Sequence, residues 1–186
     1  MRKLKLQMQL TADGFVCGPN GELDWMTWQW DDQLKAYATE LTNSFDTILL
    51  GRKMTDGFIG YWTDVVQNHP DSPDYDAAKI FVETPKIVFT KTLTESVWAN
   101  TSLATGDLVE AVNRLKNQPG RDMIVYGGAG FVASLVDARL IDELHLFINP
   151  TAIGEGLRIF TGKTPMKLMA STAFECGVVV NQYGFV

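Results

Sequence analysis

The residues best suited to chemistry in this chain are the glycines of a strand-to-helix turn. Residues 123–126 form a short apolar run, and Gly127-Gly128-Ala129-Gly130-Phe131 leads from it into a helical pattern over residues 131–138. Glycine allows the backbone to approach a ligand closely, and the first N–H groups of a helix have no partners within the helix. This turn therefore suits an anion such as phosphate.

A second turn of this kind lies earlier in the chain and carries two cations. Residues 47–50 are apolar and are followed by Gly51, Arg52, Lys53, Met54 and Thr55. Arg52 and Lys53 can reach phosphate, and the Thr55 hydroxyl can complete the cradle with the first N–H groups of the helix. A surface turn with two solvated cations is the alternative. Two such turns in one small domain indicate a ligand with more than one phosphate, hence a nucleotide cofactor.

A third group of polar residues, Thr90, Lys91 and Thr92, follows a strand predicted at residues 86–90. Its hydroxyls and ammonium can take a further phosphate. Residues 128–133 also match the G-x-G-x-x-A pattern of Rossmann folds. That fingerprint belongs to the first strand–helix unit, with an acidic residue about 20 positions later. Here it lies late in the chain, and the next strand ends near Asn149, so a Rossmann fold is not expected.

Composition excludes several classes of function. The chain has 186 residues, of which 46% are hydrophobic and 20% charged, with a net charge of −6. We expect one domain over residues 1–186, no nucleic-acid binding and no membrane span, because the chain is acidic and no apolar stretch is long enough. The two cysteines, Cys17 and Cys176, fit no metal spacing. They favour reduced thiols in a cytoplasmic protein, and we expect no metal site.

The pattern of elements predicts an α/β fold with a mainly parallel sheet and antiparallel strands at the C-terminus. Residues 3–10 alternate apolar and polar as a half-buried strand does, and helices are expected after Asp31 and over residues 108–116 and 131–138. Residues 56–78 contain Gly57, Gly60, Pro70 and Pro73, and we interpret them as mainly loop. A closing strand is expected over residues 174–185, paired with a segment near residues 166–171.

The chain resembles the dihydrofolate reductase-like superfamily in six short motifs, which follow one another in the same order as in that superfamily. The resemblance covers nearly the whole chain and is closest to the reductase domain at the C-terminus of bifunctional riboflavin-biosynthesis deaminase/reductases. The matching segments are residues 10–15, 50–55, 88–93, 125–129, 140–144 and 153–156. The resemblance implies a three-layer α/β/α fold with a mostly parallel central sheet, and NADPH as the cofactor.

Carried onto this chain, the resemblance assigns the cofactor to the three turns. The turns at residues 51–55 and 127–130 would hold the pyrophosphate, Arg52 and Lys91 would meet the adenosine 2′-phosphate, and Ala12 would lie near the nicotinamide. The implied cofactor-binding set is Ala12, Gly51, Arg52, Lys53, Met54, Thr55, Thr90, Lys91, Thr92, Tyr126, Gly127, Gly128, Ala129, Gly130 and Phe131.

The resemblance implies a second set of residues on the substrate side. Asp13 and Glu155 match positions that bind a ribosylated pyrimidine, whereas Gln7 and Gln9 stand where a substrate-binding lysine is expected. Dihydrofolate reductases carry on their first helix a carboxylate that binds the pterin and helps to protonate it. Asp31 and Asp32 occupy roughly that region, although Asp31 also suits a helix cap. Among the tryptophans near residue 25, Trp25 is the one expected to stack on a flat heterocycle, and packing explains the others.

These features predict an NADPH-dependent reductase of a small heterocycle. The substrate would be like 5-amino-6-(5-phosphoribosylamino)uracil or like dihydrofolate, and Asp31, Glu155 or water would deliver the proton. A non-catalytic nucleotide-binding protein and a broad-range flavin reductase are the alternatives. We also expect a homodimer, because the closing strands expose an edge that proteins usually pair or cover.

Overall fold

Eight strands form one sheet in the computed structural model, which describes residues 1–186. The strands are β1 (Leu4–Thr11), β2 (Phe45–Gly51), β3 (Lys86–Phe89), β4 (Thr101–Ala104), β5 (Asp122–Val125), β6 (Glu143–Asn149), β7 (Met166–Ala173) and β8 (Val179–Phe185). Their order is β4-β3-β2-β5-β1-β6-β8-β7. The strands β1 to β6 are parallel to one another, while β8 runs antiparallel to both β6 and β7. The predicted fold class and the C-terminal hairpin are therefore confirmed.

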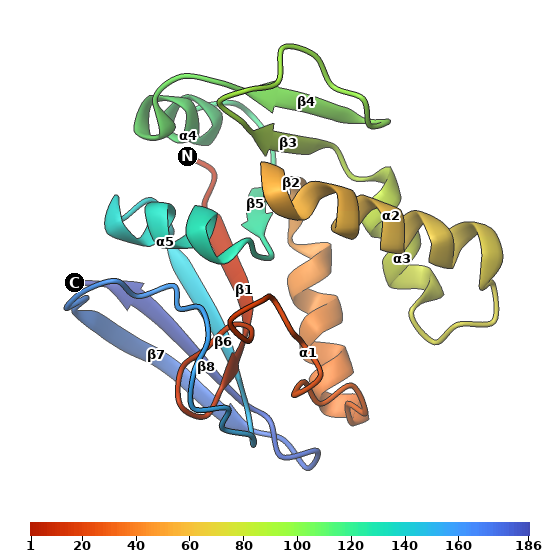
Figure 1. Cartoon of the computed structure of the whole chain (residues 1–186), viewed down its shortest axis with the longest axis vertical. Coiled ribbons are helices and arrows are strands. Elements are labelled where there is room, and N and C mark those ends of the chain that lie inside the picture. The colour runs from red at the N-terminus through yellow and green to blue at the C-terminus, as the bar shows by residue number, and fades with distance from the viewer.

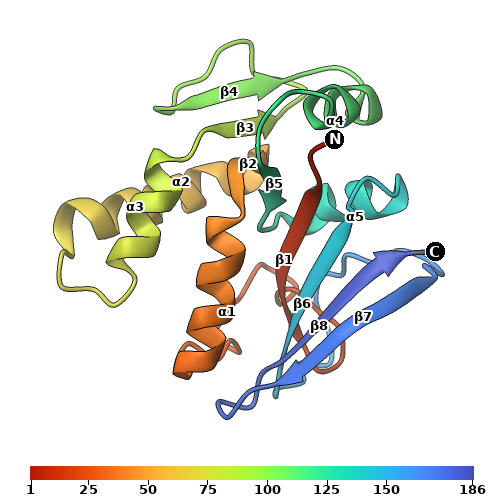
Figure 2. The same ribbon diagram turned by 180° about the vertical axis from the view of Figure 1, so that it is seen from behind.

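Five helices cover the two faces of the sheet (Figures 1 and 2). Three lie on one face: α1 (Asp32–Asn43), α2 (Arg52–Asn68) and α3 (Tyr75–Glu83). The other face carries α4 (Leu108–Lys116) and α5 (Ala129–Asp137). The chain moves along the sheet in one direction from β1 to β3 and in the other from β4 to β6. Right-handed crossovers place the two sets of helices on opposite faces for this reason. None of the five helices combines the length and the hydrophobicity that a membrane span requires.

Strict alternation in β1 divides its side chains between the two faces. Leu4, Leu6, Met8 and Leu10 are all buried against α4 and α5 in the main core. Burying one such side chain contributes about 1.5–3 kcal/mol, so this row alone anchors the centre of the sheet. The alternate residues, among them Gln7 and Gln9, face α1 and are only half-buried. The face of β1 under α1 is therefore polar.

The prediction of a mainly loop structure over residues 56–78 is wrong, because most of this segment is helical. The helix α2 continues through Gly57 and Gly60 to Asn68, and α3 begins at Tyr75. A Cβ atom at either glycine would meet nothing within 4 Å, so both lie on the open side of the helix. Phe58, Trp62 and Val65 supply the buried side at helical spacing. The two prolines fall in the short connection between the helices.

Other helices and strands begin or end a few residues from the predicted positions. The helix after Asp31 ends at Asn43 because β2 already begins at Phe45. The short edge strand β4 was not expected from its sequence, Thr-Ser-Leu-Ala. The closing strand begins at Val179, since residues 174–178 form the turn of the hairpin.

Candidate functional site

The two glycine turns lie side by side at the C-terminal edge of the parallel strands. Strands β2 and β5 are neighbours, so the helices that follow them, α2 and α5, begin next to each other. A Cβ atom at Gly51 would lie only 2.7 Å from Phe131 Cβ, and one at Gly127 would lie 3.3 Å from Met54 Sδ. Each turn thus packs on a residue of the other, and the two helix N-termini converge on one region.

These two helices differ from α1 and α4 in how their N-termini are capped. Asp31 caps α1 and Asp107 caps α4, each by accepting from a backbone N–H of the first turn. Gly51 and Gly128 are the N-caps of α2 and α5, and neither first turn contains an acid or a side-chain cap. Gly128 has a φ of +82°, which glycine adopts without strain. The free N–H groups of both helices are therefore open to an external anion.

Positive charge gathers near these N-termini. The exposed side chains of Lys53 and Lys91 make no ion pair, whereas Arg52 pairs with Asp56 at 2.9 Å. Arg52 and Lys53 lie in the first turn of α2, where the positive end of the helix dipole repels their charges. An anion bound at this turn would remove that conflict.

Several residues of the predicted cofactor set have side chains engaged elsewhere. The Thr55 hydroxyl is fully buried and donates to the Gly51 carbonyl. The buried Thr90 hydroxyl accepts from the N–H groups of Thr92 and Leu93 and shapes that turn. Tyr126 packs among the aromatic residues of α2 and α3. These residues could meet a ligand mainly through their backbone.

The loop after β1 is fastened to the loop after β6. Ala12 N–H donates to the Thr151 carbonyl, and the Asp13 carboxylate accepts from the N–H groups of Ile153 and Gly154. Hydrogen bonds from the Thr11 hydroxyl and the Gly154 N–H lower the pKa of Asp13. Asp13 is thus an ionised clamp that fixes both loops, while the neighbouring Glu155 is exposed and has no partner.

Asn149 ties the tryptophan-rich segment to the sheet. It is fully buried at the end of β6, accepts from Thr27 N–H and donates to Gln9 Oε1. Trp25 is also buried, and its Nε1 has no partner. Sequence reasoning missed Asn149, because a lone asparagine followed by proline indicates a turn and nothing more.

Both oxygens of the Asp31 carboxylate are occupied by backbone donors. Oδ1 accepts from Leu34 N–H at 2.8 Å, and Oδ2 accepts from Cys176 N–H at 2.9 Å. These two hydrogen bonds lower the pKa of Asp31. The geometry is that of a helix cap which also holds the turn of the C-terminal hairpin, so the proton-delivery role of Asp31 stays a prediction.

A polar cluster lies between α1 and the sheet, farther from the strand ends. The Tyr37 hydroxyl lies 2.6 Å from His145 Nδ1, and His145 Nε2 lies 3.5 Å from Glu143. Burial lowers the pKa of His145 and raises that of Tyr37 to about 12, so both are neutral at pH 7. Gln7, paired in register with His145, has a buried oxygen without a partner. Phe147, Leu34 and Trp30 close the apolar end of this region.

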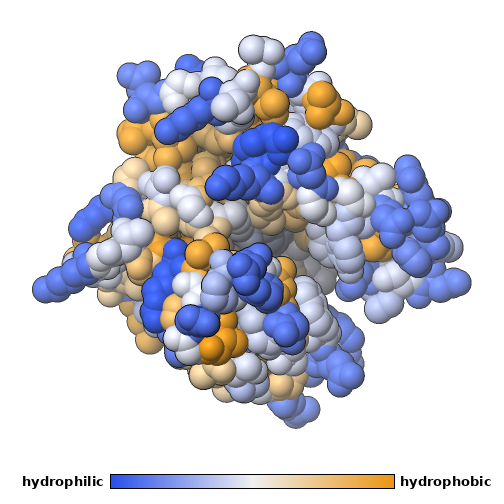
Figure 3. Space-filling view, viewed as in Figure 1, coloured by the Kyte–Doolittle hydropathy of each residue, from blue (hydrophilic) through white to orange (hydrophobic).

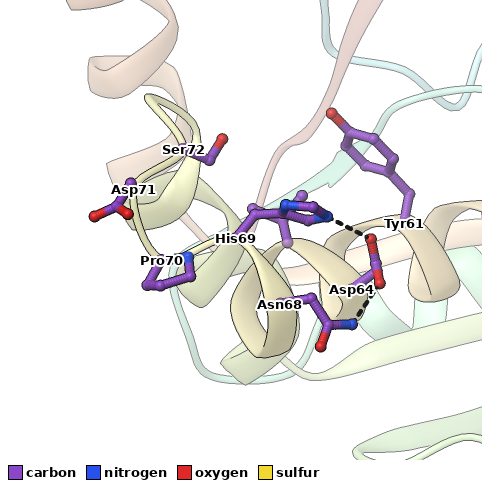
Figure 4. Close-up of a pocket in the computed structure, with 8 residues that line it drawn as sticks. Tyr61, Asp64, Asn68, His69, Pro70, Asp71 and Ser72 are labelled. Atoms are coloured by element: carbon purple, nitrogen blue, oxygen red, sulfur yellow. Dashed lines mark hydrogen bonds and ion pairs between the residues drawn. The ribbon is translucent and has the colours of Figure 1, made fainter.

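The surface is hollowed near the middle of the face that bears the start of α2, as the space-filling view shows (Figure 3). A separate hollow of about 490 Å³ lies at the far end of α2 (Figure 4). Its Asp64 already contacts His69 and Asn68, and the glycine turns take no part in it. No group of three or more His, Cys, Asp or Glu side chains could hold a metal ion.

Comparison with known proteins finds one family whose model spans nearly the whole chain. The RibD C-terminal domain family matches residues 2–180. The uncharacterized protein YyaP of Bacillus subtilis is 33% identical over 182 residues, covering 96% of this chain and 92% of YyaP. A deaminase/5-amino-6-(5-phosphoribosylamino)uracil reductase from Thermotoga maritima superimposes with a TM-score of 0.67 and 18% identity over 100% of this chain and 57% of its own. Dihydrofolate reductase from Enterococcus faecalis, complexed with NADP(H), superimposes with a TM-score of 0.63 and 14% identity over 98% and 96% of the two chains. These two structural likenesses show the fold.

Proposed function

The chain belongs to the RibD C-terminal domain family, and from this premise we propose that it is an NADPH-dependent reductase of a small heterocyclic substrate. The observation that carries the proposal is the pair of converging, uncapped helix N-termini. Gly51 and Gly128 open these helices without a capping side chain, and Phe131 and Met54 pack the two turns together. The N–H groups at both helix N-termini lack an acceptor within the chain. A pyrophosphate would offer one anionic group to each of them.

The surrounding residues support a dinucleotide with an additional phosphate. Backbone N–H groups at the starts of α2 and α5 would hold the pyrophosphate, with Lys53 beside them. Arg52 and Lys91 would meet the 2′-phosphate, which favours NADPH over NADH. Arg52 offers a planar fork that suits phosphate, and Lys91 offers an unpaired charge.

On the substrate side, the chain's own residues would position the heterocycle and exclude water. NADPH, when bound, supplies the hydride. The loop at residues 12–14, fastened by Asp13, would place Ala12 near the nicotinamide. Trp25 would form part of the substrate wall, held in place by the Asn149–Thr27 hydrogen bond. Glu155 is free to deliver a proton, directly or through water, whereas Asp31 would first have to leave its backbone partners.

The experiment is to follow the loss of NADPH absorbance with three substrates in parallel: 5-amino-6-(5-phosphoribosylamino)uracil or its precursor, dihydrofolate, and FMN. Turnover of the pyrimidine or the pterin supports the proposal and names the substrate class. Turnover of FMN alone supports a flavin reductase. Tight NADPH binding without any turnover supports a non-catalytic nucleotide-binding protein. If NADPH does not bind, the proposal fails.

We also propose a homodimer that forms through β7. This strand pairs only with β8, is exposed along nearly its whole length, and presents Leu168 and Met169, which are 52% and 60% exposed. Antiparallel pairing of two copies would satisfy the free edge and cover this apolar surface. The free thiols Cys17 and Cys176 suit a reducing, cytoplasmic compartment.

A further inference from the structure

Arg52, Asp56 and Trp98 form a closed triangle of contacts beside the start of α2. Arg52 Nη1 lies 2.9 Å from Asp56 Oδ2, and Trp98 Nε1 donates to Asp56 Oδ1 at 3.0 Å. The Arg52 guanidinium also lies 5.2 Å from the centroid of the Trp98 ring. Because each residue contacts the other two, the triangle restricts both the guanidinium and the carboxylate.

The triangle places opposite charges at the point where the cofactor's ribose would meet the protein. Arg52 attracts a 2′-phosphate, but the carboxylate of Asp56 lies against the same guanidinium and repels that phosphate. A 2′-hydroxyl has no charge to be repelled and can donate a hydrogen bond to a carboxylate. In Rossmann folds, which solve the same recognition problem on a different scaffold, an acidic residue binds the 2′-hydroxyl and an arginine accommodates the 2′-phosphate. Here both types of residue are present and paired.

We propose that Asp56 sets the cofactor preference of this chain by opposing the 2′-phosphate that Arg52 attracts. The inference rests on the proposed function and specifies one determinant of it. Trp98 holds the carboxylate in place through its Nε1–H, so Trp98 contributes to the same preference. The consequence is a chain that uses NADPH but discriminates only modestly against NADH.

The test is isothermal titration calorimetry with NADPH and with NADH on four proteins: wild type, Asp56→Asn, Trp98→Phe and Asp64→Asn. The control, Asp64→Asn, removes the same charge from an exposed position farther along α2. We expect Asp56→Asn to tighten NADPH binding about tenfold, with NADH binding unchanged or weaker. Trp98→Phe should also raise the ratio of NADPH affinity to NADH affinity, but by a smaller factor. Asp64→Asn should leave the ratio of the two affinities unchanged.

The outcomes separate the two proposals. If the wild type binds neither cofactor, the proposed function fails and the inference fails with it. If the wild type binds NADPH but Asp56→Asn and Asp64→Asn have the same affinity ratio as the wild type, the inference is wrong and the proposed function stands. Asp56 is largely exposed, so its variant should fold, and a thermal melt of each protein verifies this.

Discussion

Phe131 packs against Gly51 so closely that no side chain fits between the two glycine turns. A Cβ atom at Gly51 would lie 2.7 Å from Phe131 Cβ and 3.1 Å from its Cγ. The contact joins the third residue of α5 to the last residue of β2, and so fixes the distance between the N-termini of α5 and α2. This spacing is what a pyrophosphate would have to match.

Replacing Gly51 by alanine tests that contact. We expect Gly51→Ala to cost about 1–3 kcal/mol of unfolding free energy, because the new methyl group overpacks against Phe131. It should also weaken NADPH binding by displacing α5 from α2. Urea unfolding and calorimetry measure the two effects. Gly60→Ala is the matched control, since nothing lies within 4 Å of its added Cβ. It should stabilise α2 by about 0.5–1 kcal/mol and leave binding unchanged. Equal effects of the two variants would contradict the close contact.

Asp31 is expected to act on stability rather than on the chemical step. Its pKa is lowered by hydrogen bonds from Leu34 and Cys176 N–H, so its contribution is present above the usual carboxyl pKa of 3.8. That contribution is lost as the pH falls through the lower folded-state pKa. Asp31→Ala should therefore lower the melting temperature by a few degrees at pH 7. The stabilities of variant and wild type should converge in strong acid. A large loss of kcat with unchanged stability would instead assign the proton delivery to Asp31.

His145 is expected to make the protein less stable as the pH falls from 7 to 5. Burial lowers its pKa below the usual 6.5, while Tyr37, Glu143 and Lys5 surround it. Below pH 6.5 the imidazole of His145 is protonated in the unfolded chain but stays neutral in the folded chain. The stability that this histidine allows above pH 6.5 is therefore lost as the pH falls. Urea unfolding across this range should show the slope in the wild type and in His69→Gln. In His145→Phe the slope should largely disappear. These are the chain's two histidines. If His145→Phe keeps the slope, the buried histidine is not its source.

The proposed dimer depends on the exposed face of β7. The double variant Leu168→Lys/Met169→Lys places two charges on this strand, and we expect it to be monomeric. Sedimentation equilibrium measures the mass directly. Val97→Lys, at an apolar residue that is 76% exposed in the connection between β3 and β4, is the control and should leave a wild-type dimer intact. A monomeric wild type would overturn the dimer outright.

Much of the fold was predictable because local patterns and packing agree. The alternation of Leu4, Leu6 and Met8 reflects a strand with one face in the main core, and the apolar runs before Gly51 and Gly127 are buried central strands. The failure at residues 56–78 has a physical cause. Gly57 and Gly60 oppose helix formation locally, but Phe58 and Trp62 pack on Phe81 and repay that cost only once the tertiary structure exists.

The two glycine turns of the candidate site were predictable from the sequence, whereas the contacts between distant side chains were not. Both turns are indicated by glycines that stand between a short apolar run and a helical pattern. The Arg52–Trp98 contact, the Asp13 clamp on Gly154 and the Asn149–Thr27 hydrogen bond each join residues more than 40 positions apart. No spacing rule in a single sequence indicates such pairs, so their roles emerge only from the folded chain.

If the proposed function is right, a dinucleotide binds across the N-termini of α2 and α5. Amide hydrogen exchange, measured with and without saturating NADPH, shows whether these two N-termini are its binding site. We predict slower exchange at residues 52–55 and 128–131, with little change near His69 at the far end of α2. NADPH binding that leaves both turns unprotected, or that protects the region around His69 instead, would contradict it.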